Sequence, residues 1–191
     1  MIGHRQIAGG ALLILAILGL FLWYNAVGSY LAINDARLNL PQHVSIVEVE
    51  VPELTSAESR ATVGVLVRIE NPSAAPIIVF RITYEFYMDN LTDTRPFWEK
   101  HEDIYVGPGG FYEAEGGFEV PAGGVRWIWA NLTVDDDVRP HSLERLNTSF
   151  NGRYYPIVLG ALQYRFPGTN IVESVRSLTF STPMGVIPHE D

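Results

Sequence analysis

The segment His101-Glu102-Asp103 carries three adjacent side chains that can bind a metal ion or transfer a proton. A helical zinc-protease motif needs a second histidine four residues after the first, and position 105 is a tyrosine. The segment also lacks a helical pattern of apolar residues. We therefore expect His101, Glu102 and Asp103 to be solvated residues of a strand or loop.

A second group of side chains, Asp135, Asp137, His141 and Glu144, could bind calcium, which prefers clustered oxygen ligands. The spacing lacks the glycine and the terminal glutamate of an EF-hand loop. The interpretation that we favour is an acidic turn that caps a short helix within residues 135–147. We predict no metal ion and no cofactor for this chain.

Motifs of covalent catalysis are also missing from the sequence. The chain has no cysteine, and it contains neither a Gly-x-Ser-x-Gly elbow nor a phosphate-binding glycine loop. We predict no catalytic residue and a protein that is not an enzyme, with a hydrolase or metalloenzyme as the third and least favoured reading.

Trp127 and Trp129 are the candidate binding residues. They share strand parity with Asn131 and Thr133, which belong to an Asn-Leu-Thr sequon. If Asn131 carries a glycan it faces solvent, and both indoles then face solvent too. Two exposed indoles would form a docking patch for a protein or lipid partner. The interpretation that we favour is nevertheless that a bulge reverses the parity or that a loop covers the rings.

Three sequons mark possible glycosylation sites, at Asn90, Asn131 and Asn147. A fourth candidate, Asn71, is followed by proline and is excluded. All three sequons follow the apolar N-terminal segment, which supports export of the part of the chain that carries them.

Residues 7–33 contain no charged side chain and are long enough to span a membrane as a helix. Trp23, Tyr24 and Tyr30 lie toward the end of this run, where aromatic rings prefer the headgroup layer. We predict that the membrane bilayer is a partner of the chain through residues 7–33, as an uncleaved signal anchor.

The orientation follows from the charges that flank the span. Arg5 and the terminal amine precede it, so the positive-inside rule places residues 1–6 in the cytoplasm and the part of the chain after Asn34 outside the cell membrane. The alternative is a cleaved signal peptide, for which Val27-Gly28-Ser29 is the best but a poor cleavage site.

The formal net charge of −9 bears on the remaining partner classes. Nucleic-acid binding depends on neutralising phosphates with Lys and Arg, so we predict no nucleic-acid partner. The same charge disfavours electrostatic adhesion to anionic lipids.

Beyond the anchor the apolar residues recur with a period of two. Residues 61–69 and 78–86 alternate between apolar and polar side chains, which is typical of antiparallel strands with one solvated face. Turns rich in Asn, Pro and Gly separate the strands. Alternation fails at Val175 and Arg176, where we expect a β-bulge.

This pattern divides the exported part into three predicted segments. Residues 34–42 are a linker, residues 43–182 are the β domain, and residues 183–191 are a C-terminal tail. Regularly spaced short strands with such turns favour a sandwich or a barrel.

The stretch VGVLVRIENPSAAPIIVFRITYEFYM resembles the late-embryogenesis-abundant type 2 domain, also called the water-stress and hypersensitive-response (WHy) domain. An apolar strand is followed by Asn71-Pro72, by Pro76 and by a strand of alternating aromatics. FEVPAGGVRWIWANLTV and YYPIVLGALQYRF are similar to later parts of that family, and the likeness spans residues 44–180. The resemblance implies an immunoglobulin- or fibronectin-III-like antiparallel β-sandwich in a membrane-anchored member. Asn71, Pro72 and Pro76 are then turn residues with a structural role.

The sequence thus predicts an all-β, immunoglobulin/fibronectin-III-like antiparallel sandwich preceded by one transmembrane helix. The expected function is a non-catalytic extracytoplasmic module that binds lipid or protein at the outer membrane surface, with a stress association that only the resemblance implies. The alternative is a structural subunit of a larger envelope assembly, such as a stator or tether.

Overall fold

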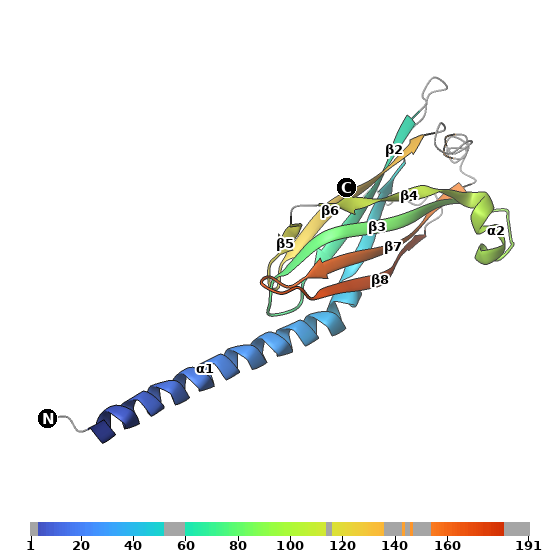
Figure 1. Cartoon of the computed structure of the whole chain (residues 1–191). Helices are drawn as coiled ribbons and strands as arrows, with labels where there is room; N and C mark the ends of the chain where they lie inside the picture. The colour runs from blue at the N-terminus through green and yellow to red at the C-terminus, as the bar shows by residue number, and fades with distance from the viewer. Residues whose placement is uncertain are drawn as a thin grey trace, which may run out of the picture.

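The computed structural model describes residues 4–51, 60–113, 116–135, 143, 146 and 154–181 (Figure 1). The chain begins with one long helix and continues into a body of strands. The helices are α1 (His4–Asn39), the 3-10 turn η1 (Leu40–Gln42) and α2 (Phe97–Ile104). The strands are β1 (Val44–Glu50), β2 (Arg60–Glu70), β3 (Ile77–Asn90), β4 (Tyr105–Tyr112), β5 (Phe118–Val120), β6 (Val125–Asp135), β7 (Tyr154–Arg165) and β8 (Val172–Ser181).

All the strand pairings are antiparallel, and the strand order is β1-β2-β6-β4-β3-β7-β8, with β5 paired to β3. The edge strands β1 and β8 approach each other, so the sheet curls into a nearly closed sandwich (Figure 1). The prediction of an all-β antiparallel sandwich preceded by one apolar helix is confirmed.

The core follows from the period of two in the sequence. The inward-facing residues of β2 alternate from Ala61 to Ile69, and each is at most 7% exposed, whereas Leu66 on the other face is half-buried. Phe86 of β3 and Leu162 of β7 are 0% exposed and belong to the same core cluster. Burying an aliphatic or aromatic side chain of this size contributes about 1.5–3 kcal/mol, so these strands supply most of the driving force for the fold.

The alternation in β3 is interrupted, which corrects the simple pattern expected for residues 78–86. Val79 pairs with Tyr164 and Arg81 with Gln163, so Phe80 is an extra residue in the ladder. Ile77 and Val79 face the core before Phe80, and Ile82, Tyr84 and Phe86 face it afterwards. One inserted residue shifts the parity because successive strand side chains point to opposite faces.

The bulge expected near Val175 and Arg176 is present and lies one residue further along. Gly160 pairs with Leu178 and Ala161 with Arg176, so Ser177 is unpaired. Ser177 has a φ of 68°, a left-handed conformation that is uncommon for a residue other than glycine. The bulge keeps Val175 and Leu178 buried on either side of it.

The segment expected to be a solvated strand or loop around His101 is instead the helix α2. Phe97, Lys100 and Ile104 occupy spacings of three and four residues, which is one face of a helix. The sequence analysis missed this helical pattern because a lysine, Lys100, occupies the face that would be expected to be apolar. Phe97 packs its ring against Tyr87, with ring centroids 5.1 Å apart.

Helix α1 continues without a break through residues 34–39, the first part of the expected linker. The last turns of the helix join the sandwich because Ala36 and Leu40 are 0% exposed and belong to the core cluster. Arg37 Nε lies 3.0 Å from Glu173 Oε1 on β8. These contacts fix the direction of α1 relative to the sandwich.

Candidate functional site

The outer face of β2 and β6 carries the two indoles singled out from the sequence. Trp127 is 55% exposed and Trp129 is 43% exposed. The β2–β6 register runs unbroken from Arg60 opposite Asp135 to Glu70 opposite Val125, so no bulge reverses the parity of β6. The rings therefore face outward, and we call Trp127, Trp129, Arg68 and Glu70 the indole surface.

Neighbouring side chains and backbone hold both indoles in place. The Arg68 guanidinium carbon lies 5.9 Å from the Trp127 ring centroid, within cation–π range, and Arg68 Nη2 lies 2.6 Å from Glu70 Oε2. The Trp129 ring lies over Gly64, where an added Cβ would come within 2.9 Å of it. The indole surface is thus preorganised, with an aromatic pair beside one cation and one carboxylate.

Trp127→Ser is expected to change the free energy of unfolding by less than about 1 kcal/mol, since the ring is largely solvated. The matched core variant Phe86→Ala should lose about 3–5 kcal/mol because it opens a cavity. Chemical denaturation of both variants measures the contrast. If Trp127→Ser were as damaging as Phe86→Ala, the indole would be part of the core and not a free surface.

Two of the three sequon asparagines fall within the described residues. Asn131 is exposed on the outer face of β6, two residues from Trp129. Asn90 ends β3, and its Oδ1 accepts hydrogen bonds from the Thr92 backbone N–H and hydroxyl at 2.9 and 2.8 Å. Asn147 lies outside the described residues. Glycosylation of any of them remains a prediction.

Asn71 is fully buried at the turn between β2 and β3, where its amide makes a network of hydrogen bonds. Its Nδ2 donates to the carbonyls of Ala75, Val120 and Pro121 at 2.8, 3.2 and 3.1 Å. Its Oδ1 accepts from the Ser73 hydroxyl at 2.7 Å. Asn71 therefore ties its own turn to the β5–β6 turn, and Pro72 and Pro76 flank the residues that it organises.

The metal-ligand candidates are not brought together among the described residues. His101 Nε2 lies 3.6 Å from Glu102 Oε1, and both are on the solvent side of α2. Asp137, His141 and Glu144 lie outside the described residues, as does the short helix expected for residues 135–147, apart from helical Leu143 and Leu146. In the described part of the chain, no group of three His, Asp or Glu side chains could hold a metal ion.

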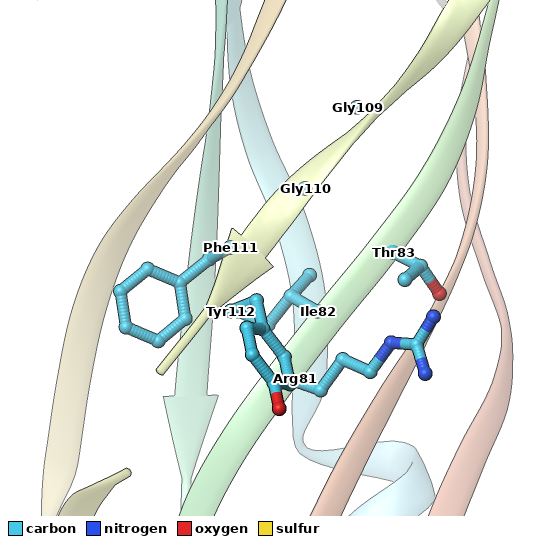
Figure 2. A pocket seen from close by; sticks show the side chains of 7 residues that line it. All are labelled: Arg81, Ile82, Thr83, Gly109, Gly110, Phe111 and Tyr112. Atoms are coloured by element: carbon cyan, nitrogen blue, oxygen red, sulfur yellow. The ribbon is translucent and has the colours of Figure 1, made fainter. Parts of the chain in front are cut away.

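A shallow, open hollow of about 510 Å³ lies over β3 and β4 (Figure 2). Its floor includes Gly109 and Gly110, and Arg81 and Tyr112 stand opposite each other at one end. At Gly109 an added Cβ would lie 2.3 Å from the Tyr84 ring, whose hydroxyl donates to the Ala130 carbonyl at 3.0 Å. The absence of a side chain at Gly109 thus lets Tyr84 bridge β3 to β6. The β4–β6 ladder adds one pair, Gly110–Asn131, to this link.

Sequence reasoning missed a buried polar network between α2, β3 and β7. Lys100 Nζ lies 2.8 Å from Asp89 Oδ1, and the exposed fractions of the two residues are 5% and 2%. Tyr155 donates its hydroxyl to Asp89 Oδ2 at 2.9 Å, and Lys100 also donates to the Asp93 carbonyl at 2.8 Å. Lys100 is the single lysine of the chain. Its position three residues after Phe97 and four before Ile104, on one face of a helix, is the sequence signal that could have revealed the buried network.

Burial of two tyrosines of β7, Tyr155 and Tyr164, makes the stability of the fold depend on pH in the alkaline range. Burial, followed by the hydrogen bond to Asp89, raises the pKa of Tyr155 from 10.0 to about 12. Burial also raises the pKa of Tyr164 to about 12. A raised folded-state pKa means that stability is complete below pH 10 and falls as the pH rises toward 12.

Denaturation followed at the phenolate absorbance band should therefore show unfolding becoming easier between about pH 10 and 12. An increment of phenolate absorbance should appear only on unfolding. The double variant Tyr155→Phe and Tyr164→Phe should lose part of this increment, and the rest should remain because burial also raises the pKa values of Tyr84 and Tyr87. Ionisation of all the tyrosines of the folded protein with a midpoint near pH 10 would show that these hydroxyls are solvated.

The fold and the indole surface define a class of protein: an antiparallel β-sandwich carried on one apolar N-terminal helix, with an aromatic surface on its side. No family model matches the sequence, and no curated protein matches it. Comparisons with solved structures find matches at low identity.

A protein from Archaeoglobus fulgidus is 15% identical, with 72% of this chain and 98% of that chain covered at a TM-score of 0.41. The ApaA protein from Bordetella pertussis is 13% identical, with 75% and 93% covered at a TM-score of 0.44. A late embryogenesis abundant protein is 12% identical, with 73% and 70% covered at a TM-score of 0.37. These likenesses are too weak to assign a family or an activity to the chain.

Proposed function

We propose that this protein is a membrane-anchored, non-catalytic module that holds its β-sandwich at the outer surface of the cell membrane. The observation that carries the proposal is the exposure of α1. Its Leu, Ile, Phe, Trp and Tyr side chains from Leu12 to Leu31 are at least half exposed, whereas Ala36 near its end and Leu40 just after it are buried in the sandwich. By length and composition α1 is suited to cross a membrane.

Transfer of this helix into lipid removes the exposed apolar area from water. At about 25 cal/mol per Å² the gain is large, and the helical backbone satisfies its own hydrogen bonds in the bilayer. Residues 7–33 extend about 40 Å as a helix, which exceeds the hydrocarbon thickness of about 30 Å and leaves room for tilt. The exposed apolar surface of α1 is thus suited to the hydrocarbon interior of a bilayer.

The anchoring is tested by washing membranes that contain the full chain with alkaline carbonate. The chain should stay in the pellet and enter solution only with detergent. The variant Leu15→Lys with Leu18→Lys places two charges at the centre of the span, each opposed by about 3 kcal/mol, and should be released. Release of the unaltered chain by carbonate would overturn the anchor.

The task that we propose for the sandwich is to dock a protein partner on the indole surface. Trp and Arg are enriched among the residues that dominate protein–protein affinity, and Trp127, Trp129 and Arg68 stand together on one face. The stress association and the WHy-type family membership rest on the sequence resemblance around Asn71-Pro72.

Photo-crosslinking from a benzoylphenylalanine at position 127 tests the docking in intact membranes. The matched control carries the same group at position 179, an exposed position of β8 on the other side of the strand order. A discrete protein adduct from position 127, absent from position 179 and lost with Arg68→Ala, supports the proposal. Adducts only to lipid, or equal adducts from both positions, would overturn it.

A second candidate function is favoured by the junction of helix and sandwich. Ala36, Leu40 and the Arg37–Glu173 ion pair fix the direction of α1, and a fixed junction suits a stator or tether in a larger envelope assembly. Mild detergent extraction followed by native mass measurement separates the two. A stable complex with other chains in fixed ratio favours the assembly subunit.

A further inference from the structure

Three turns of the sandwich share an unusual composition. Residues 71–76 read Asn-Pro-Ser-Ala-Ala-Pro, residues 121–124 read Pro-Ala-Gly-Gly, and residues 166–171 read Phe-Pro-Gly-Thr-Asn-Ile. None of them contains a charged residue, although 18% of the chain is charged. Turns on the surface of a soluble domain normally carry charge, so a reason is needed for three neutral ones.

The strand register places these three turns at one end of the sandwich. Glu70 pairs with Val125, Ile77 with Val120, and Ile78 with Arg165, so the strand ends that flank the three turns lie at the same end of the sandwich. Hydrogen bonds from Asn71 to the carbonyls of Val120 and Pro121 join two of the turns directly. Strand β1, which follows α1, begins at this end too, because Val44 pairs with Ile69.

Helix α1 brings this end of the sandwich toward the membrane. Arg37 pairs with Glu173 on β8, and Ile171 lies two residues before Glu173 on the side of the turn. Two residues of extended chain cover about 6.6 Å, which equals about four residues of helix. The turn at Ile171 therefore reaches about the level of Ile33, where the uncharged run of α1 ends. Figure 1 shows the β7–β8 turn beside α1.

Exposed apolar side chains gather at the same end. Val125 is 41%, Ile171 is 45%, Trp127 is 55% and Val172 is 55% exposed. The opposite end is charged, with Asp93, Arg95 and the solvent side of α2 among its exposed or half-exposed groups. Trp98, 73% exposed, and Leu91, 48% exposed, also lie at that opposite end, and Glu119 and Arg126 are exposed beside the neutral turns. The contrast between the two ends therefore lies in the turns themselves, which are neutral only at the end toward α1.

We infer that the three neutral turns rest on the headgroup layer of the bilayer that α1 crosses. This inference rests on the proposed anchoring and adds the orientation of the sandwich to it. A neutral surface with apolar side chains and an indole at its edge suits the interface, where Trp is favoured and charge is not needed. The lipid is zwitterionic phosphatidylcholine-like lipid, because the net charge of −9 disfavours an anionic surface.

The bilayer is the occupant because this surface is continuous with α1. Ile33 packs against the core cluster while the helix before it is exposed and apolar, so the apolar surface of the helix ends where the sandwich begins. Protein docking on the indole surface is compatible with this arrangement, since Trp129 lies further from the turns than Trp127 does.

Single nitroxide labels test the inference in the full chain, reconstituted in phosphatidylcholine vesicles. The chain has no cysteine, so Ala122→Cys, Asn170→Cys, Thr94→Cys and Phe21→Cys each place one label. All four residues are exposed, so folding should be kept, and circular dichroism of each labelled variant verifies it. Accessibility to oxygen, which concentrates in lipid, is compared with accessibility to a water-soluble nickel chelate.

The label at position 21 should be deep in lipid and the label at position 94 fully in water. Labels at 122 and 170 should be several-fold less accessible to the chelate than the label at 94, at headgroup depth. If the label at 21 is in lipid but 122 and 170 match 94, the inference fails and the anchoring stands. If the label at 21 is itself in water, the proposed anchoring fails, and the inference fails with it.

Discussion

Lys100→Met is expected to lower the free energy of unfolding by about 3–5 kcal/mol, the usual effect of removing one partner from a buried ion pair. Methionine matches the unbranched stem of lysine but leaves the Asp89 carboxylate without its cation. Asp89 is 2% exposed, and the donors that remain to it are the Tyr155 hydroxyl and the Asn90 backbone N–H. For a chain of this size the melting temperature should fall by about 12 °C.

The double variant Lys100→Met with Asp89→Asn is the control for this prediction. It removes both charges and should recover much of the loss, because the remaining amide no longer carries an unpaired charge. Tyr155→Phe, which removes one hydrogen bond to the Asp89 carboxylate, should lose about 1.5–3 kcal/mol, less than Lys100→Met. If Lys100→Met unfolded at the same denaturant concentration as the unaltered chain, the ion pair would be solvated and α2 would be loosely attached.

Asn71→Ala is expected to lose about 3 kcal/mol, and about 10 °C in melting temperature, because one side chain serves several buried groups. The substitution removes the donor to the Ala75, Val120 and Pro121 carbonyls and the acceptor of the Ser73 hydroxyl. Both ends of the link between the β2–β3 turn and the β5–β6 turn are then lost.

Asn71→Asp separates the lost hydrogen bonds from the lost volume. The side chain keeps its size, yet a carboxylate at neutral pH cannot donate and faces carbonyl oxygens, so the loss should equal or exceed that of Asn71→Ala. Asn131→Ala, at an exposed position, should stay within about 0.5 kcal/mol. A mild effect of Asn71→Asp beside a severe effect of Asn71→Ala would mean that packing, and not the hydrogen bonds, holds the turn.

The sandwich could be anticipated because its strongest signals are local. The apolar residues from Ala61 to Ile69 recur with a period of two, and only a strand places residues with this period on one buried face. The turns between strands are rich in Pro and Gly. The expectation that a bulge or a loop hides Trp127 and Trp129 was wrong, because β6 pairs with β2 without a bulge and both indoles are exposed. Local periodicity is enough to predict which side chains face the core where the hydrogen-bond ladder is regular.

The parts that the sequence did not predict depend on contacts between distant residues. A buried lysine hid the helical face of α2, since only its pairing with Asp89 makes burial of Lys100 tolerable. The parity shift at Phe80 arises from the pairing of β3 with β7. The neutral turns are visible in the sequence, but only the strand register places them at one end of the sandwich.

The most direct test of the account is labelling of single cysteines in intact cells with a membrane-impermeant maleimide. Thr94→Cys lies at the charged end of the sandwich, and Gly3→Cys lies before α1. If α1 spans the membrane with the sandwich outside, the cysteine at 94 is labelled in intact cells and the cysteine at 3 only after permeabilisation. Labelling of position 3 alone, or of neither position until the cells are opened, would contradict the account.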